Sequence, residues 1–293
     1  MGSGRPACDA ELVTRLEAPG WDVVGIRASN PSPLTLSGTN SWLIGRGPTW
    51  LIDPGPALAE HVEELDHEIA RRGSLGGIAL THGHADHAEA VSAIRERHPG
   101  APVAAAHGEV DIRLPDGSAF GPLVVLATPG HARDHLTYLF GRVAFTGDAV
   151  LGEGSVFLSP YPGALIGYLD ALSRLRQASL ELICPGHGPL VDAPPTKLDE
   201  YIAHRLDRER RLAEALAAGK RTVEDLLDDA WSEVPAGLRA PAALTLAAHL
   251  DKLDEEGRLP DGVERPSASG WPRQAGRPVA HPALPGRPAE EES

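Results

Sequence analysis

The chain has 293 residues, of which 42% are hydrophobic and 23% charged, an ordinary composition for a soluble globular protein with one large domain or a domain and a small appendage. Its formal net charge of −14 excludes a general electrostatic attraction to nucleic acid or to an anionic membrane, although a local basic groove is compatible with it. No apolar run approaches the roughly 18 residues of a spanning helix, and the N-terminal segment lacks the apolar core of a secretory signal, so we expect a cytoplasmic protein with no membrane partner.

The first part of the chain combines short strands with helices. Apolar residues from Leu58 to Ile69 recur at spacings of three and four, which predicts a helix over residues 58–72, just after a turn at Asp53-Pro54-Gly55. A second unit has a strand, a histidine-rich loop and a helix over residues 86–97. The strands predicted in this part cover residues 21–26, 41–44, 50–52 and 78–80.

The middle of the chain has short apolar runs with tight ends, which indicate buried strands. Leucines at helical spacing predict an amphipathic helix over residues 165–177. Because strands and helices mix in both halves, we expect two sheets covered by helices rather than one sheet of alternating strands and helices. The strands predicted here cover residues 123–127, 138–140, 142–145 and 180–184.

From residue 196 the pattern becomes helical. Helices are predicted over 197–218, from a capping box at Thr222-Val-Glu-Asp225, and from about residue 241 to Gly257, with a short hairpin beginning at Arg258. A unit of this size is typical of a winged-helix module, which normally binds nucleic acid. Its acidic residues favour instead a helical cap packed on a catalytic core.

Three parts are therefore predicted. Residues 1–195 form a catalytic domain, residues 196–265 a helical unit for which a winged-helix fold is the alternative, and residues 266–293 a Pro-rich tail with too little apolar content to fold.

The sequence Thr81-His82-Gly83-His84-Ala85-Asp86-His87 carries the most chemical information. After an apolar strand, this spacing puts His82 and His84 on the same side of an extended segment. Asp86 and His87 fall where the next helix begins, where a carboxylate also gains from the positive helix end. Imidazole and carboxylate are the ligand types that zinc takes at catalytic sites.

Three further metal-competent side chains share one local design. His131, Asp148 and His187 each come directly after a glycine, just beyond a predicted strand. The glycine permits a sharp turn at the strand end. Three repeats of this device indicate one shared metal site.

Taken together, these motifs resemble the metallo-β-lactamase superfamily, over about residues 20 to 195. The resemblance implies an αββα sandwich that binds two zinc ions along one edge of its sheets. It implies that His82, His84 and His131 hold the first metal, that Asp86, His87 and His187 hold the second, and that Asp148 bridges them.

Within that superfamily, several segments resemble the subgroup that contains the lactamase-like endoribonuclease, which also has a small winged-helix-like C-terminal region. The segments are Asn30-Pro-Ser-Pro, Gly38-Thr-Asn-Ser-Trp-Leu-Ile44, Asp53-Pro-Gly55, Gly147-Asp-Ala-Val-Leu-Gly152 and Tyr201-Ile-Ala-His-Arg205. One departure is Ala88-Glu-Ala90, which stands where many members, including glyoxalase II, have a Gly pair. This weakens transfer of the glyoxalase substrate.

The ligand set implies chemistry in which two zincs about 3.5–4 Å apart share a water and generate hydroxide near neutral pH. We expect a hydrolase of an ester, thioester or phosphodiester. Two alternatives stay open: an endoribonuclease of single-stranded RNA, and a glyoxalase II-type thioesterase acting on a small molecule. A remote alternative is a sulfur dioxygenase with one iron.

Candidate catalytic residues are Asp86, Asp148 and His135. His135 could orient a ligand, although a histidine satisfied by backbone at a strand start is equally compatible. His204 and Arg205 could reach over the site to contact an anionic substrate. Asp53 is expected mainly to close its turn. Five further histidines are expected to have surface or packing roles; they are His61, His67, His98, His107 and His249.

Overall fold

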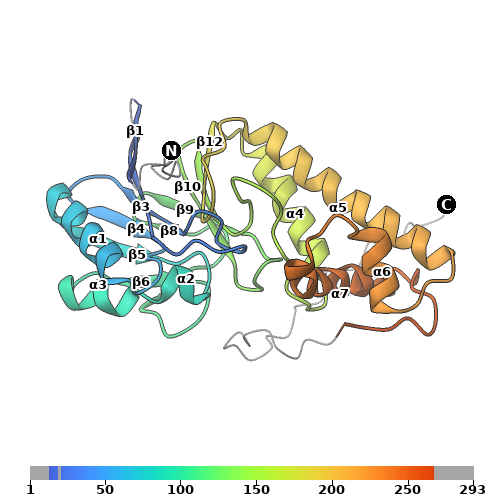
Figure 1. The fold of residues 1–293 in the computed structure, drawn as a ribbon. Helices are drawn as coiled ribbons and strands as arrows, with labels where there is room; N and C mark the ends of the chain where they lie inside the picture. The colour runs from blue at the N-terminus through green and yellow to red at the C-terminus, as the bar shows by residue number, and fades with distance from the viewer. Residues whose placement is uncertain (1–12, 19–20, 267–293) are drawn as a thin grey trace, which may run out of the picture.

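The computed structural model describes residues 13–18 and 21–266 (Figure 1). Their strands form two sheets, one of seven strands in the order β1-β2-β3-β4-β5-β6-β7 and one of five in the order β12-β11-β10-β9-β8. The first sheet comprises β1 (Val13–Ala18), β2 (Trp21–Arg27), β3 (Asn40–Ile44), β4 (Thr49–Ile52), β5 (Leu75–Ala79), β6 (Val103–Ala105) and β7 (Ile112–Arg113). The second comprises β8 (Ala119–Phe120), β9 (Leu123–Ala127), β10 (Leu136–Phe140), β11 (Val143–Gly147) and β12 (Leu182–Pro185).

Both sheets are mixed. Strands β1 to β4 are antiparallel, whereas β4 to β7 run parallel. In the second sheet β8 to β11 are antiparallel and β12 is parallel to β11. A parallel pair needs a crossover connection, and helices supply it. Helix α1 (Ala59–Arg72) connects β4 to β5, and α4 (Ala164–Gln177) connects β11 to β12.

The alternation of side chains along the strands creates the layers. Trp42 and Ile44 of β3 face the core between the two sheets, while Leu43 faces the core under the helices on the outside. In the second sheet Phe145 faces the inter-sheet core and Ala144 the outer helix layer. Helices α1 and α3 (Val91–Arg97) cover one sheet and α4 the other, so the predicted αββα sandwich is confirmed (Figure 1).

The C-terminal unit begins with a long helix that belongs to both parts of the molecule. Helix α5 (Pro194–Ala217) packs against α4 at one end and against α6 (Val223–Ala230) further along (Figure 1). A 3₁₀ turn (Ala236–Leu238) leads into α7 (Arg239–Glu255), which also contacts α4. A separate apolar core, which includes Leu212, Leu226 and Leu246, joins α5, α6 and α7.

Most of the predicted elements are present within a few residues of their predicted bounds, and two predictions were wrong. The helix predicted over residues 86–97 is interrupted, forming α2 (Ala85–Ala88) and α3. At the break, Ala90 N donates to Gly55 O at 2.9 Å and Gly55 N donates to His87 O at 2.9 Å, so a tertiary contact with the Asp53-Pro-Gly55 turn replaces continuous helix.

The second error is the hairpin predicted from Arg258, since no strand follows α7 within the described residues. Instead Glu264 returns to the start of α6, donating its N–H to Arg221 O and accepting from Val223 N. The predicted cap at Thr222 is confirmed, because its Oγ1 accepts from Asp225 N at 3.2 Å. The tail predicted to be disordered lies outside the described residues from 267 onward.

No helix in the described ranges is long and apolar enough to cross a membrane.

Candidate metal centre

Four strand ends from the two sheets meet at one place. Strand β5 of the first sheet leads to Thr81 and His82, and strands β9, β11 and β12 of the second lead to His131, Asp148 and His187. His84 precedes the short helix α2, and Asp86 and His87 lie within it. The strand–glycine–ligand pattern of the sequence therefore converges in space, as the shared design of its turns implies.

The seven predicted ligands form two clusters. The donor atoms of His82, His84, His131 and Asp148 all lie within 4.8 Å of one another, and so do those of Asp86, His87 and His187. His131 Nε2 is 3.0 Å from His84 Nδ1, and His87 Nε2 is 3.2 Å from His187 Nε2.

Asp148 connects the two clusters. Its Oδ2 is 3.4 Å from His131 Nε2 in the first cluster, while Oδ1 is 3.4 Å from His87 Nε2 and 3.3 Å from His187 Nε2 in the second. Asp86 Oδ2 is 3.3 Å from His187 Nε2. A carboxylate that reaches both clusters has the position of a bridging ligand.

The donor set fits metal ions. In the two clusters, His82 Nε2 and Asp148 Oδ1 are buried without a hydrogen-bond partner. A buried polar atom without a partner is costly, and here both atoms lie among paired imidazole nitrogens that face each other. Imidazole and carboxylate donors at this spacing suit a divalent ion such as zinc.

The electrostatics of the clusters agree with that fit. Burial, followed by the charge on His87, lowers the pKa of His82 well below its usual value, so this imidazole is neutral as a metal ligand must be. Burial opposes ionisation of Asp148, but His187 and His87 outweigh it and hold the pKa of Asp148 well below its usual range. An ionised carboxylate at this point favours a cation between the clusters.

Most of the histidines are oriented through their Nδ1 atom, so that Nε2 points into the centre. Nδ1 of His82 contacts Thr81 Oγ1 at 3.0 Å, Nδ1 of His131 contacts Phe157 O at 3.0 Å, and Nδ1 of His187 contacts Gly38 O at 3.3 Å. His84 is the reverse case, with Nδ1 turned toward His131. Such outer contacts fix the ring orientation and the tautomer of a ligand.

Asp53 contacts residues of the metal centre in addition to closing its turn. It accepts from Thr81 N and Thr81 Oγ1, both at 2.7 Å, and its Oδ2 lies 2.9 Å from His87 Nδ1. Its backbone is in the left-handed region, with φ of 49°. Asp53 is thus a positioning residue for His87. The signal was present in the sequence, since the Asp ends a buried strand just as the ligands do.

His135 lies behind the centre rather than in it. Its Nδ1 is 2.8 Å from Thr128 Oγ1, and its Nε2 accepts from Asp148 N at 3.1 Å. Both nitrogens are therefore engaged, and His135 holds the backbone of Asp148 as a positioning residue.

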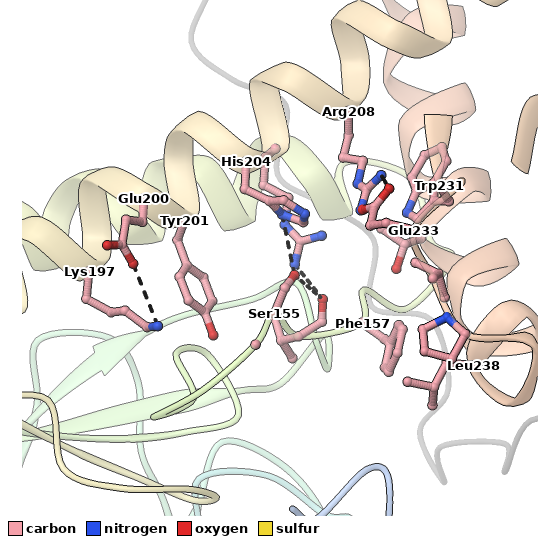
Figure 2. Close-up of a pocket in the computed structure, with 16 residues that line it drawn as sticks. Ser155, Phe157, Lys197, Glu200, Tyr201, His204, Arg208, Trp231, Glu233 and Leu238 are labelled. Atoms are coloured by element: carbon pink, nitrogen blue, oxygen red, sulfur yellow. Dashed lines mark hydrogen bonds and ion pairs between the residues drawn. The ribbon is translucent and has the colours of Figure 1, made fainter. Parts of the chain in front are cut away.

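The other histidines of the described residues do not join the clusters. His61 is buried against Ser41 Oγ at 3.0 Å, His98 pairs with Asp66 at 2.8 Å, and His249 is buried between helices. His204 and Arg205 lie on α5, where they line a neighbouring cavity rather than the centre itself (Figure 2).

A cavity of about 230 Å³ opens in front of the clusters. His84, Asp86 and Asp148 line its polar side. Apart from Glu153 and Ser155, the rest of its lining is largely apolar and includes Leu34, Leu36, Leu151, Val156, Phe157 and Leu238. This arrangement suits a small polar reacting group carried on an apolar body.

Comparison with known proteins agrees with this geometry. The Metallo-beta-lactamase superfamily model matches residues 34–114 and 113–187, and the model of the Beta-lactamase associated winged helix domain matches residues 222–263. The second match supports the winged-helix alternative for the C-terminal unit. Within the matched residues the structure has the helices α6 and α7.

Two relatives illustrate the range of similar proteins. A Beta-lactamase-like protein 2 homolog of Caenorhabditis elegans is 31% identical over 257 residues, covering 80% of this chain and 85% of the relative. An Atrochrysone carboxyl ACP thioesterase of Aspergillus chevalieri is 30% identical over 240 residues, covering 73% of this chain and 74% of the relative.

Solved structures share the fold. A beta-lactamase domain protein from Burkholderia ambifaria aligns with a TM-score of 0.70 and 22% identity, over 86% of this chain and 92% of that one. A metallo-beta-lactamase family protein from Thermus thermophilus aligns with a TM-score of 0.65 and 24% identity, over 82% and 95%. With its αββα sandwich and its converging His and Asp side chains, the chain belongs to the metallo-β-lactamase superfamily and is a metal-dependent hydrolase.

Proposed function

We propose that this protein hydrolyses thioesters or related small esters at a centre that holds two zinc ions. The observation that carries the proposal is the pair of ligand clusters joined by Asp148 in front of a largely apolar cavity. The similarity to an ACP thioesterase supports a thioester as the substrate class.

His82, His84 and His131 would hold one zinc and Asp86, His87 and His187 the other, with Asp148 between them. When bound, the metal pair supplies hydroxide at neutral pH and polarises the carbonyl to be attacked. Asp86, whose side chain is 30% exposed toward the cavity, is positioned to accept the proton of the attacking water. His135 and Asp53 keep Asp148 and His87 oriented, and the apolar wall excludes bulk water.

The endoribonuclease alternative has less support. The winged-helix match is in its favour, but the net charge is −14 and the cavity before the clusters has no Lys or Arg among the described residues that line it. A strand of RNA needs a cationic path for its phosphates. Single-stranded RNA is therefore included in the test as a comparison substrate.

The test compares substrates on zinc-loaded protein. We expect about two zincs per chain by elemental analysis, and release of thiol from S-lactoylglutathione or from octanoyl-N-acetylcysteamine. Asp148→Asn, which keeps the side-chain shape, should abolish turnover. Cleavage of end-labelled single-stranded RNA without thioester turnover would overturn the thioester proposal. A single iron and no hydrolysis would favour the dioxygenase alternative.

A further inference from the structure

A second cavity of about 450 Å³ lies beside the metal centre (Figure 2). It is enclosed by α5, by residues 231–238 between α6 and α7, and by the segment 154–157. Trp231, Val234 and Leu238 contribute apolar wall. Its polar side chains come mainly from one face of α5, where Lys197, Tyr201, His204, Arg205 and Arg208 follow at helical spacing.

The two cavities share a wall. Residues 154–157 and Leu238 line both the second cavity and the cavity in front of the metal ligands. On the metal side, Phe157 O is in contact with His131 Nδ1 at 3.0 Å. On the other side, Val156 O accepts from Arg205, and Ser155 Oγ is 3.5 Å from His204 Nδ1 (Figure 2). The two cavities thus adjoin each other on either side of this segment.

Two buried arginines line the second cavity. The Arg205 side chain is only 2% exposed, and no carboxylate among the described residues forms an ion pair with it. Its guanidinium lies over the Tyr168 ring at 5.3 Å and donates to Val156 O, while its buried Nε has no hydrogen-bond partner. Arg208, also buried, lies over the Trp231 ring at 5.3 Å, and its Nε is likewise without a partner.

The acidic residues of this cavity lie at its rim. The side chain of Glu233, the partner of Arg208, is 55% exposed, and that of Glu200, the partner of Lys197, is 62% exposed. Burial, together with the charges of Arg205 and Arg208, lowers the pKa of His204 to about 4, so His204 adds hydrogen bonding but no charge at neutral pH. The permanent cations that line the cavity are Lys197, Arg205 and Arg208. Lys197 and Arg208 have acidic partners, whereas Arg205 has none among the described residues.

A buried guanidinium without a counter-charge is costly unless something else satisfies it. Carboxylate and phosphate are the groups that an Arg fork binds best. We propose that this second cavity is an anion-recognising substrate site, which binds the apolar body and the negatively charged end of the thioester through Arg205 and Arg208. The inference rests on the proposed function and specifies its substrate class as anionic thioesters.

The anion can belong to either half of such a substrate. It is a carboxylate if the acyl half enters the cavity, and a phosphate if the thiol half enters it. Three thioesters separate these cases: octanoyl-N-acetylcysteamine, which has no anion; suberyl-N-acetylcysteamine, which ends in a carboxylate; and octanoyl-phosphopantetheine, which carries a phosphate.

We expect one anionic thioester to exceed the neutral one by about tenfold or more in kcat/KM, as one charge-assisted contact supplies. Arg205→Gln and Arg208→Gln should reduce that ratio toward one, chiefly by raising KM. Arg210→Gln is the matched control, because Arg210 lies on the same helix, with its side chain 58% exposed and paired to Asp207 and Glu214. It should leave the ratio unchanged.

Equal turnover of all three thioesters by the wild type would overturn the anion site while leaving thioester hydrolysis intact. An equal loss on all three in Arg205→Gln would assign that residue a purely structural role. Failure to hydrolyse any thioester would count against the proposed function instead, and binding then decides: Trp231 fluorescence should respond to octanoate or phosphopantetheine in the wild type. No response to either probe would overturn the inference.

If thermal melting shows that Arg205→Gln does not fold, a second variant tests the same cavity. Val234→Glu places a carboxylate in the wall of the cavity, where Val234 is only partly buried. It should lower the preference for the anionic thioester several-fold by competing for the arginines. An unchanged preference in this folded variant would contradict the proposal.

Discussion

At the scale of single residues, the carboxylate of Asp53 tests how far a metal ligand depends on its neighbours. Asp53→Asn keeps the size of the side chain and tolerates the φ of 49°. Its amide, however, turns a donor toward either Thr81 or His87 Nδ1, where the carboxylate accepts. We expect zinc affinity to fall by a factor of about 10–100. Competition with a chelator measures it, and Asp66→Asn at the surface should retain wild-type affinity.

Gly186 lies so close to the metal ligands that a substitution there tests whether the centre has room for a side chain. A Cβ at this position would lie 2.7 Å from His87 Cε1 and 2.9 Å from Asp148 Oδ1. Because the φ of Gly186 is not in the left-handed region, Gly186→Ala adds steric conflict without backbone strain. We expect it to lose at least one of the two metals while the sheets stay folded. Gly83→Ala is the control, since a Cβ there meets nothing within 4 Å. Equal metal content in both variants would refute this account.

At the scale of secondary-structure elements, helix α1 is fixed to the first sheet by a buried charge cluster. Glu68, 2% exposed, accepts from Arg15, Arg71 and Arg72, and Arg72 also pairs with Asp22. Burial opposes the ionisation of Glu68, but the hydrogen bonds from Arg71 and the other arginines outweigh it and lower its pKa from 4.5. The stabilisation is therefore complete above the unfolded-state pKa and is lost as the pH falls below it.

Glu68→Gln should lower the free energy of unfolding at neutral pH by about 3 kcal/mol, because it removes the buried carboxylate and leaves Arg72 with only the partly exposed Asp22 as an ion-pair partner. The difference from the wild type should shrink as the pH falls below about 4.5, where the unfolded wild type takes up a proton. Urea unfolding from pH 7 to 3 measures this. Glu64→Gln, on the exposed face of the same helix, should show neither effect, and a gap for Glu68→Gln that is independent of pH would contradict the assignment.

At the scale of the whole molecule, local sequence patterns predicted the metal ligands better than the elements and the cavity around them. Four ligands could be found because they lie in one short motif, Thr81 to His87, and three because each follows a strand and a glycine directly in the chain. The break in the helix at Ala90 depends on Gly55, which is distant in sequence, so periodicity could not predict it. Strands such as β7 (Ile112–Arg113) are too short to carry a pattern. The second cavity combines α5 with two loops, and only His204 and Arg205 pointed toward it in the sequence.

The same topology predicts how the molecule responds to loss of metal. His82 follows a strand of the first sheet and His131 a strand of the second, so a metal held by both links the two layers. A ligand that binds only the folded state stabilises it by about 4 kcal/mol when its free concentration is about a thousand times Kd. For a domain of this size that corresponds to a rise in Tm of roughly 10 °C.

Removing metal with a chelator should therefore lower the Tm of the protein by that amount, and adding zinc should restore it. Asp148→Asn should respond less, because it lacks the carboxylate that joins the clusters. If the chelator left the Tm of the wild type unchanged, the converging side chains would not hold a metal in solution, and the hydrolytic chemistry assigned to them would fall with it.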